Sequence, residues 1–331
     1  MRAFVVSEYK GPLEPADVRE PEVGDHDVLV RVRAAGLNQL DEKIRTGEFR
    51  QFLRYTLPLI LGNEVAGTVI GVGANVQRFA LGDEVYARPD QDRIGTFAER
   101  IAVAEADLAL KPVSVSFEEA ASLPLVALTA WQALVERGNL KRGQRVLIHG
   151  GAGGVGTIAI QLAKHLGATV ATTVSAANVD FVRELGADIV VDYRSQDFEQ
   201  LLDGYDLVLD SLGGKNLEKS LRVLRPGGKA IGIAGPPDAA FARELGANPL
   251  LRLVMTALSS GIRRQARRLG VTYEFLFVRA SGDQLRRITA LVDGGALRPV
   301  VGRVFDFDQT VQAVQSLEAG GIRGKAVISR P

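Results

Sequence analysis

The stretch Val146-Leu-Ile-His-Gly-Gly-Ala-Gly-Gly-Val-Gly156 decides the fold of this 331-residue chain. Its apolar start is typical of a buried β-strand, and the next residues, 157–164, are typical of a buried helix. Gly151, Gly153 and Gly156 fit the pattern G-x-G-x-x-G between the two elements. In this setting the first glycine allows a tight turn, the second lets backbone N–H groups approach a pyrophosphate, and the third lets helix and strand pack closely. The stretch therefore predicts a dinucleotide-binding turn.

Around this turn the chain alternates between strands and helices. We expect helices at 155–166 and 179–185, and strands at 145–148, 169–174, 189–191, 207–209 and 229–233. Such alternation predicts a doubly wound parallel sheet with helices on both faces. The segment from Pro236 to Gly270 is interpreted as a long connecting loop.

The two ends of the chain show a different sequence pattern from the alternating strands and helices of its middle part. Up to about residue 112, short β-type runs such as 27–33 and 65–73 are separated by Gly, Pro and Asp turns, which predicts a compact β domain. Ser116, with acidic residues behind it, predicts the start of a helix. From about residue 280 helix, turn and strand return, and we expect this tail to rejoin the first domain.

The charge and composition of the chain limit the kinds of partner that we expect it to bind. Lys and Arg total 40 against 39 Asp and Glu, so the net charge of +1 gives no reason to expect nucleic acid or an anionic membrane as the main partner. A small molecule is expected instead. The run Arg263-Arg-Gln-Ala-Arg-Arg268 is interpreted as a solvated helix face rather than a nucleic-acid patch. The start of the chain lacks the features of a signal peptide, so we expect a cytoplasmic protein.

The end of the second predicted strand indicates which dinucleotide binds. NAD-binding folds place an Asp or Glu there, on the ribose hydroxyls. This chain has Thr172-Thr-Val-Ser-Ala-Ala-Asn178, with Ser175 about where the acid would stand and no carboxylate before Asp180. A hydroxyl can donate to a 2′-phosphate, whereas a carboxylate repels it, so NADPH is favoured over NADH. Against this interpretation, no Arg or Lys lies in the segment to pair with the phosphate.

An ordered set of motifs along nearly the whole chain resembles one family. The motifs are Ala35-Gly-Leu-Asn-Gln-Leu-Asp41, Leu61-Gly-Asn-Glu-Val-Ala-Gly-Thr-Val69, Gly82-Asp-Glu-Val85, Leu123-Pro124 with Leu128-Thr-Ala130, the glycine turn, and Leu185-Gly-Ala-Asp188 with Val191-Asp-Tyr193. The chain resembles the medium-chain dehydrogenase/reductase superfamily, in its zinc-independent quinone oxidoreductase branch.

The resemblance implies two domains of an α/β protein. A GroES-like β-barrel catalytic domain would comprise residues 1–123 and 279–331, and a Rossmann domain would comprise 124–278, with the active site in the cleft between them. The resemblance also implies a homodimer joined through the last Rossmann strand, which would be Val271–Val278.

The resemblance also bears on the site residues. Candidate donors near the cleft are Asn38, Asp41, Lys43 and Tyr55. Asn38 and Asp41 match the family's Gly-Leu-Asn-x-x-Asp element, and Tyr55 is a candidate to protonate an enolate. For two of them a structural role stays open, in which Asn38 caps the following helix and Asp41 lies in its first turn. The implied cofactor-binding residues are Thr129, Gly151, Ala152, Gly153, Gly154, Val155, Ser175, Asn178, Tyr193, Ser211, Ala234, Gly235 and Phe277.

No metal site is expected. The chain has no cysteine, Asn38 stands where zinc-dependent relatives carry a Cys, and Asn63 stands where they carry a His. The three histidines have no metal-ligand spacing. Without a Lewis acid to ionise an alcohol, reduction of an electrophilic acceptor remains. We therefore expect NADPH-dependent reduction of quinones or α,β-unsaturated carbonyls. A dedicated enone or enoyl-thioester reductase and an NADPH-binding sensor stay open as alternatives.

Overall fold

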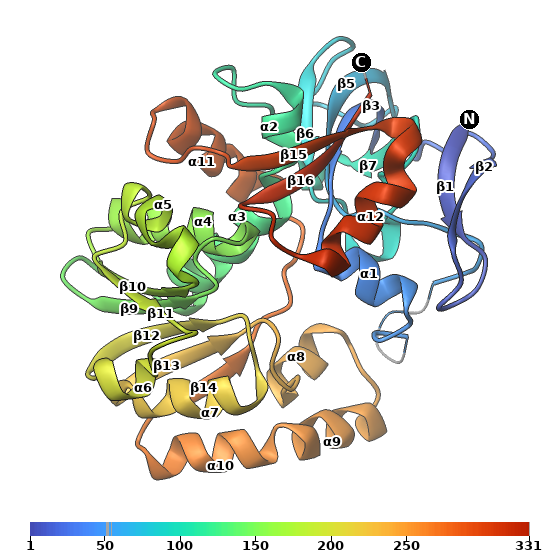
Figure 1. Cartoon of the computed structure of the whole chain (residues 1–331). Coiled ribbons are helices and arrows are strands. Elements are labelled where there is room, and N and C mark those ends of the chain that lie inside the picture. The colour runs from blue at the N-terminus through green and yellow to red at the C-terminus, as the bar shows by residue number, and fades with distance from the viewer. Residues whose placement is uncertain (51–52, 54, 331) are drawn as a thin grey trace. The chain divides into compact units, whose positions relative to one another are not determined.

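The computed structural model of the protein describes residues 1–50, 53 and 55–330, which form two compact units (Figure 1). One unit is Met1–Leu128 together with Arg279–Pro331, and the other is Thr129–Val278. The boundary falls inside helix α3 (Pro124–Trp131).

The unit Thr129–Val278 is built on a parallel sheet of six strands. From edge to edge the order is β11 (Ile189–Asp192), β10 (Thr169–Val174), β9 (Arg145–His149), β12 (Tyr205–Asp210), β13 (Leu224–Gly232) and β14 (Thr272–Phe275). The chain runs from β9 to one edge and then returns to β12 to build the other half. This reversal confirms the predicted doubly wound α/β fold and puts its switch point between β9 and β12.

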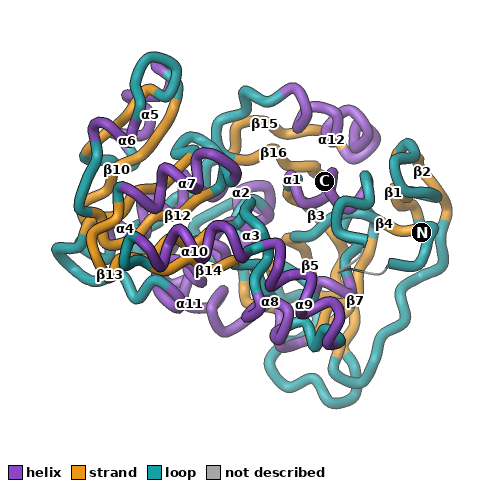
Figure 2. The backbone as a smooth tube through the Cα atoms, turned by 90° about the horizontal axis from the view of Figure 1, so that it is seen from below, coloured by secondary structure: helices purple, strands orange, loops and turns teal. Residues whose placement is uncertain are grey.

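Helices connect these strands. The segment 236–270, which we predicted to be a loop, contains three of them. The helices are α4 (Gly154–His165), α5 (Val179–Glu184), α6 (Phe198–Leu201), α7 (Gly214–Arg222), α8 (Ala239–Glu244), α9 (Pro249–Leu258) and α10 (Ser260–Arg268). The loop prediction for 236–270 was wrong because Asp238 and Asn248 cap the N-termini of α8 and α9 with their side chains. Figure 2 shows α9 and α10 end to end.

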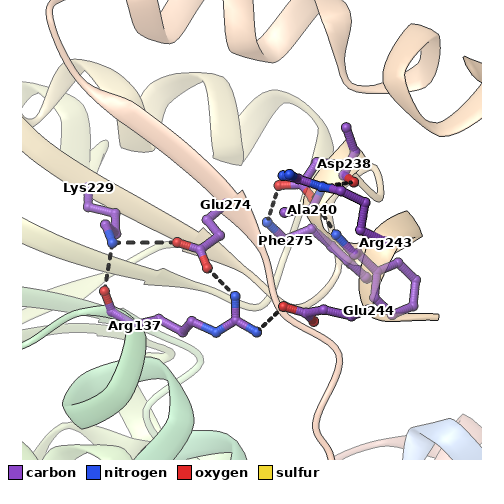
Figure 3. Close-up of polar contacts among 10 residues, drawn as sticks. Arg137, Lys229, Asp238, Ala240, Arg243, Glu244, Glu274 and Phe275 are labelled. Carbon is purple, nitrogen blue, oxygen red and sulfur yellow. Dashed lines mark hydrogen bonds and ion pairs between the residues drawn. The ribbon is translucent and has the colours of Figure 1, made fainter. Parts of the chain in front are cut away.

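Edge strand β14 is shorter than the predicted strand Val271–Val278. Hydrogen bonds and ion pairs of charged side chains connect it to neighbouring elements (Figure 3). Arg137 donates to Glu274 on β14 at 2.6 Å and to Glu244 on α8 at 2.5 Å. Lys229 on β13 donates to the carbonyl oxygen of Arg137 at 2.6 Å and lies 3.4 Å from Glu274. These contacts tie three elements to the same edge of the sheet.

A second contact in Figure 3 joins α8 to β14. Asp238 accepts the backbone N–H groups of Ala240 and Phe241, each at 2.9 Å, and that of Phe275 at 3.1 Å. The N–H of Leu276 bonds to Gly232 on β13, so the N–H of Phe275 points to the open side of the strand. Asp238 therefore fills one of the few hydrogen-bonding positions that this edge offers.

The other unit is mainly β-sheet. Its larger sheet has the order β15 (Val301–Asp306), β16 (Lys325–Ser329), β3 (Asp27–Gly36), β5 (Val65–Val72), β6 (Glu84–Ala87) and β8 (Leu108–Leu110), with β7 (Arg100–Ala104) also paired to β3. A smaller sheet joins β2 (Leu13–Asp17), β1 (Arg2–Val6) and β4 (Leu59–Ile60). One apolar core lies under both, with Phe4, Val30, Leu61, Phe97 and Phe305 among its buried residues.

The helices of this unit are α1 (Gln39–Arg45), α2 (Phe117–Ala121), α11 (Gly282–Asp293) and α12 (Thr310–Ala319). Ser116 caps α2 as predicted, since its hydroxyl accepts the N–H of Glu119. Strand β16 pairs antiparallel with β3, so the last residues of the chain complete a sheet that begins near its start. None of the helices described has both the length and the apolar character that a membrane span requires.

Candidate functional site

The glycine turn connects β9 to α4, and three of its glycines are needed for two different reasons. Gly150 has a φ of +67°, a conformation that glycine adopts without strain. A Cβ on Gly151 would lie 2.2 Å from Oγ1 of Thr172, and one on Gly156 would lie 2.3 Å from the carbonyl oxygen of Gly150. The left-handed residue that makes the turn is thus Gly150, one position before the motif, while Gly151 and Gly156 allow close packing.

Gly153 differs from these glycines because the space beside it is open. Its Cβ would have only the carbonyl oxygen of Gly150 nearby, at 3.4 Å. Gly153 is the N-cap residue of α4, with a φ of −83° that any residue adopts. The N–H groups in the first turn of a helix have no acceptor within the helix. Packing and backbone conformation therefore do not require glycine here, and the open space leaves room for an anion to approach the N–H groups of Gly154 and Val155.

Further predicted cofactor residues lie at the same edge of the sheet, because the carboxyl ends of parallel strands meet there. Ser211 follows β12, and its hydroxyl donates to the carbonyl oxygen of His149 at 3.1 Å. Ala234 and Gly235 follow β13, and a Cβ on Gly235 would lie 2.4 Å from the hydroxyl of Tyr273. These residues flank the switch point, where open α/β sheets bind their ligands.

Ser175, Asn178 and Tyr193 form a second group, at the ends of β10 and β11. The side-chain amide of Asn178 donates to the hydroxyl of Ser175 at 3.2 Å. The N–H of Tyr193 donates to the carbonyl oxygen of Val174 at 3.1 Å, and Tyr193 is 58% exposed. The guanidinium carbon of Arg194 lies 6.0 Å from the centre of that ring. Sequence reasoning missed Arg194 because it searched for a cation only in the Ser175 segment.

Two predicted cofactor residues lie on other elements. Thr129 is buried in α3. Phe277 lies beyond the end of β14, with its ring centre 5.6 Å from that of Phe241.

A buried polar chain supports the base of the glycine turn. Nδ1 of His149 lies 2.9 Å from the hydroxyl of Thr173, and Nε2 lies 2.9 Å from the hydroxyl of Ser220. Ser220 in turn donates to Asp210 at 3.0 Å. Burial lowers the pKa of His149 to about 4, although the charge of Asp210 opposes this shift. His149 is therefore neutral at pH 7 and fixes the end of β9 as a packed residue.

In the other unit, Asn38 and Asp41 belong to a buried polar cluster, which we call the Lys325 cluster: Asn38, Asp41, Asn63, Glu64 and Lys325. Each of these residues is at most 6% exposed. Nζ of Lys325 lies 2.5 Å from both Oδ1 of Asn38 and Oε1 of Glu64. Nδ2 of Asn38 donates to Glu64 at 2.8 Å, and Nδ2 of Asn63 donates to Asp41 at 2.6 Å.

The backbone completes this cluster. The N–H of Asn38 donates to Asp41 at 2.7 Å, and the N–H of Leu125 donates to Glu64 at 2.8 Å. The carbonyl oxygen of Leu37 accepts from Lys325 at 2.5 Å. Oδ1 of Asn63 is buried without a partner among the described residues. Burial raises the pKa of Asp41 to about 7, and its bonds to Asn63 and Asn38 only partly offset the shift.

The four predicted donors therefore have different surroundings: two are buried in the Lys325 cluster and two lie outside it. Asn38 is the N-cap residue of α1 and Asp41 lies in its first turn, as the structural alternative predicted, but the Asn38 side chain turns to Glu64 instead. Lys43 on the same helix is partly exposed and lies 3.7 Å from Glu48. The hydroxyl of Tyr55 donates to the carbonyl oxygen of Gln91 at 2.8 Å, and burial raises its pKa.

Sequence reasoning missed Glu64 and Lys325 as members of this cluster. The only sequence signal for Glu64 was its place beside Asn63 in the Gly-Asn-Glu motif. Lys325 carried none, because 287 positions separate it from Asn38 along the chain.

Comparison with known proteins places the chain in a family. Residues 24–113 match the family "Alcohol dehydrogenase GroES-like domain", and residues 185–328 match "Zinc-binding dehydrogenase". The chain is 38% identical to the NAD(P)H oxidoreductase RTN4IP1, mitochondrial, of Danio rerio, over 92% of this chain and 84% of that protein. It is 35% identical to the NADPH-dependent alkenal/one oxidoreductase, chloroplastic, of Arabidopsis thaliana, over 99% of this chain and 79% of that protein.

Among solved structures, the quinone oxidoreductase from Coxiella burnetii superposes with a TM-score of 0.87 at 32% identity, over 100% of this chain and 99% of that one. The chain belongs to the medium-chain dehydrogenase/reductase superfamily, in its zinc-independent quinone oxidoreductase-like branch. This confirms the resemblance drawn from the motifs.

One of the matched families is named for zinc, but the residues of the Lys325 cluster do not suit that metal. Asn38 and Asn63 offer amides in place of thiolate or imidazole, which are the usual protein ligands of zinc. Oδ1 of Asn38 and Oε1 of Glu64 already bind the ammonium group of Lys325. A divalent cation at these oxygens would be repelled by that ammonium group. The residues of the Lys325 cluster therefore do not fit a zinc ion.

Proposed function

We propose that this protein reduces quinones or α,β-unsaturated carbonyls by hydride transfer from NADPH. The open space beside Gly153, at the N-terminus of α4 and at the switch point of the sheet, is the observation that carries the proposal. A residue with a side chain there would fill the cradle that a pyrophosphate needs. The name of the relative from Danio rerio supports oxidoreduction with NAD(P)H, and that of the relative from Arabidopsis thaliana supports NADPH as the cofactor and an alkenal or enone as the acceptor.

The residues at the ends of β10 and β11 suit NADPH better than NADH. The hydroxyl of Ser175 can donate to a 2′-phosphate, and Arg194 supplies the positive charge that the Ser175 segment lacks. The exposed ring of Tyr193 offers a face on which an adenine can stack. Bound at this edge, NADPH would supply the hydride, and Ser211, Ala234 and Gly235 would line the way towards its nicotinamide end.

The unit Met1–Leu128 with Arg279–Pro331 would bind the acceptor. An oxyanion forms when a quinone or enone takes up hydride, and a positioned donor stabilises it. We propose Lys43 as one donor, because its ammonium group is partly exposed. We propose Tyr55 as the other, with its single O–H exchanging the bond to the carbonyl oxygen of Gln91 for one to the acceptor. We assign Asn38 and Asp41 to positioning the start of α1, because Asp41 is fully buried and both of its oxygens are occupied.

Two further properties stay predictions from the sequence. One is the cytoplasm as the compartment, although the relative from Danio rerio is named mitochondrial. The other is a homodimer joined through β14. For that edge, the bond from Phe275 to Asp238 leaves fewer free backbone groups than the predicted strand Val271–Val278 would offer.

The proposal is tested by following the loss of nicotinamide absorbance with NADPH and with NADH. The acceptors are an ortho-quinone, a para-quinone, an alkenal and a cyclic enone. We expect turnover of at least one acceptor, with NADPH preferred, and the preferred acceptor then identifies the subclass. Measurable NADPH binding without turnover of any acceptor would reject the general reductase and favour a dedicated enoyl-thioester substrate or a sensing role.

A further inference from the structure

We propose that one surface of the unit Thr129–Val278 binds an anionic phospholipid bilayer. This surface, the α9–α10 face, comprises Leu250, Leu253, Val254 and Leu258 on α9 and Arg264, Arg267 and Arg268 on α10. The inference does not rest on the proposed reductase activity.

Helix α9 turns its large apolar side chains outward. Leu250 is 71% exposed, Leu253 66%, Leu258 56% and Val254 41%. Positions 250, 253 and 254 follow the spacing of three and four residues that places side chains on one helix face. Isolated exposed leucines are common on protein surfaces, but a contiguous apolar stripe marks an interaction site.

The charge carried by the segment that contains α9 and α10 is entirely positive. From Leu245 to Tyr273 the chain has five arginines and no Asp, Glu or Lys. Arg264, Arg267 and Arg268 on α10 are exposed, and none of the ion pairs of the described residues involves them. The net charge of +1 therefore averages over a local excess of positive charge.

Both parts of the α9–α10 face point to the same side. The backbone stays helical across Ser259, whose N–H donates to the carbonyl oxygen of Met255 and whose carbonyl oxygen accepts the N–H of Arg263. Met255, Ser259 and Ala266 are buried, so this line of residues faces the unit. The exposed leucines and arginines lie away from it, on helices that run end to end in Figures 1 and 2.

A bilayer fits this composition better than the other classes of partner. In a two-fold contact between copies centred on this face, the arginines of one copy would meet either the arginines or the leucines of the other, and neither contact supplies a negative charge to pair with them. Nucleic acid would pair with the arginines but leave the leucines in water. An anionic bilayer surface accepts both, since leucines enter the boundary of headgroups and acyl chains while arginines pair with lipid phosphates.

The experiment is sedimentation of the full-length protein with vesicles of phosphatidylcholine alone, or of phosphatidylcholine mixed with phosphatidylglycerol. We expect binding to the mixed vesicles, weaker binding to neutral ones, and release at high salt because the Debye length shortens. Equal binding to both kinds of vesicle, or binding to neither, overturns the proposal.

Two double variants test the two parts of the face. Arg264→Glu with Arg268→Glu should weaken binding to the mixed vesicles by at least about tenfold, because each arginine near an anionic surface contributes to affinity. The matched control, Lys141→Glu with Arg142→Glu, makes the same change of charge at exposed positions of the same unit and should bind better than the first variant. Equal losses in both variants overturn the assignment to α10.

For the apolar part, Leu250→Ser with Leu253→Ser should also weaken binding by about tenfold, since both side chains would lose their place in the bilayer boundary. The control is Leu81→Ser with Val113→Ser, at positions that are 68% and 89% exposed. Light scattering of the same proteins tests whether a second copy of the chain covers the face instead of a bilayer. If Leu250→Ser with Leu253→Ser converts a dimer to a monomer, the face is an interface between copies and the bilayer proposal fails.

Discussion

The ammonium group of Lys325 lies 2.5 Å from a carboxylate oxygen of Glu64, and the two side chains are only 6% and 0% exposed. Strand β16 brings Lys325 from the end of the chain, while Glu64 immediately precedes β5. The pair thus links β16 to the start of β5 within the larger sheet, beside Asn38, the N-cap residue of α1. A buried charge pair of this kind fixes the positions of its elements more than it adds net stability.

We predict that Lys325→Met destabilises the protein strongly, because Glu64 would stay buried without its counter-charge. Removing one partner of a buried pair costs about 3–5 kcal/mol in free energy of unfolding. Urea unfolding checks this, with Lys164→Met as the control, because Lys164 and Asp188 form a similar pair whose side chains are 35% and 38% exposed. That control should cost less than about 1 kcal/mol.

Adding Glu64→Gln to Lys325→Met should recover part of the loss, since the buried negative charge is then removed. If Lys325→Met proves no more damaging than Lys164→Met, the pair does not hold the two ends of the chain together.

Asp41 is predicted to make stability fall as the pH rises. Its folded-state pKa of about 7 lies above the ordinary value of 3.8, so the folded protein binds more protons than the unfolded chain between these values. The free energy of unfolding therefore decreases from about pH 4 to pH 7, by up to about 4 kcal/mol from this group. In Asp41→Asn this contribution disappears.

The measurement is the unfolding free energy of both proteins from pH 5 to pH 8, and the difference between them isolates Asp41 from other titrating groups. Asn63 can rotate its amide to present its unpartnered Oδ1 to the amide group that Asp41→Asn introduces, so the variant should fold. A difference that stays constant with pH would show that Asp41 titrates normally.

The sequence predicted the parts of the fold that depend on local pattern. The glycine turn, with an apolar strand before it and a helix after it, identified β9, α4 and the doubly wound sheet, because period and turn chemistry are read over a few residues. The capped start of α2 was visible for the same reason. The shorter β14 was not, since side chains from α8 and β13 determine where that edge ends.

The site was less predictable where it depends on distant residues. The partnership of Lys325 with Asn38 and Glu64 arises from the pairing of β16 with β3, which no local pattern specifies. Arg194 was overlooked as a candidate partner of a 2′-phosphate because it follows β11, whereas the sequence pattern was read only at the end of β10; the two strands end side by side. Both errors come from reading contacts along the chain instead of across a sheet.

The glycines of the turn should separate folding from cofactor binding. We predict that Gly156→Ala lowers both the melting temperature and NADPH affinity, because its Cβ would lie 2.3 Å from the carbonyl oxygen of Gly150. Gly153→Ala has its nearest atom at 3.4 Å and should melt like the wild type, yet bind NADPH at least about tenfold more weakly through its methyl group in the phosphate cradle. Thermal melting and fluorescence titration check both. Normal NADPH binding by Gly153→Ala would remove the cradle from the cofactor site.

Arg194 should determine the preference for NADPH. A hydrogen bond between charged groups contributes about 1.5–3 kcal/mol, so Arg194→Ala is expected to raise the Kd for NADPH by roughly ten- to a hundredfold and to leave that for NADH nearly unchanged. Arg183→Ala is the matched control, because Arg183 is an exposed arginine on α5 whose nearest acidic partner is Asp180, at 3.9 Å. Titration of each variant with both dinucleotides distinguishes the possibilities. Equal weakening of both would mean that Arg194 supports the adenosine end as a whole, and unchanged binding of both would leave Ser175 as the sole basis of the preference.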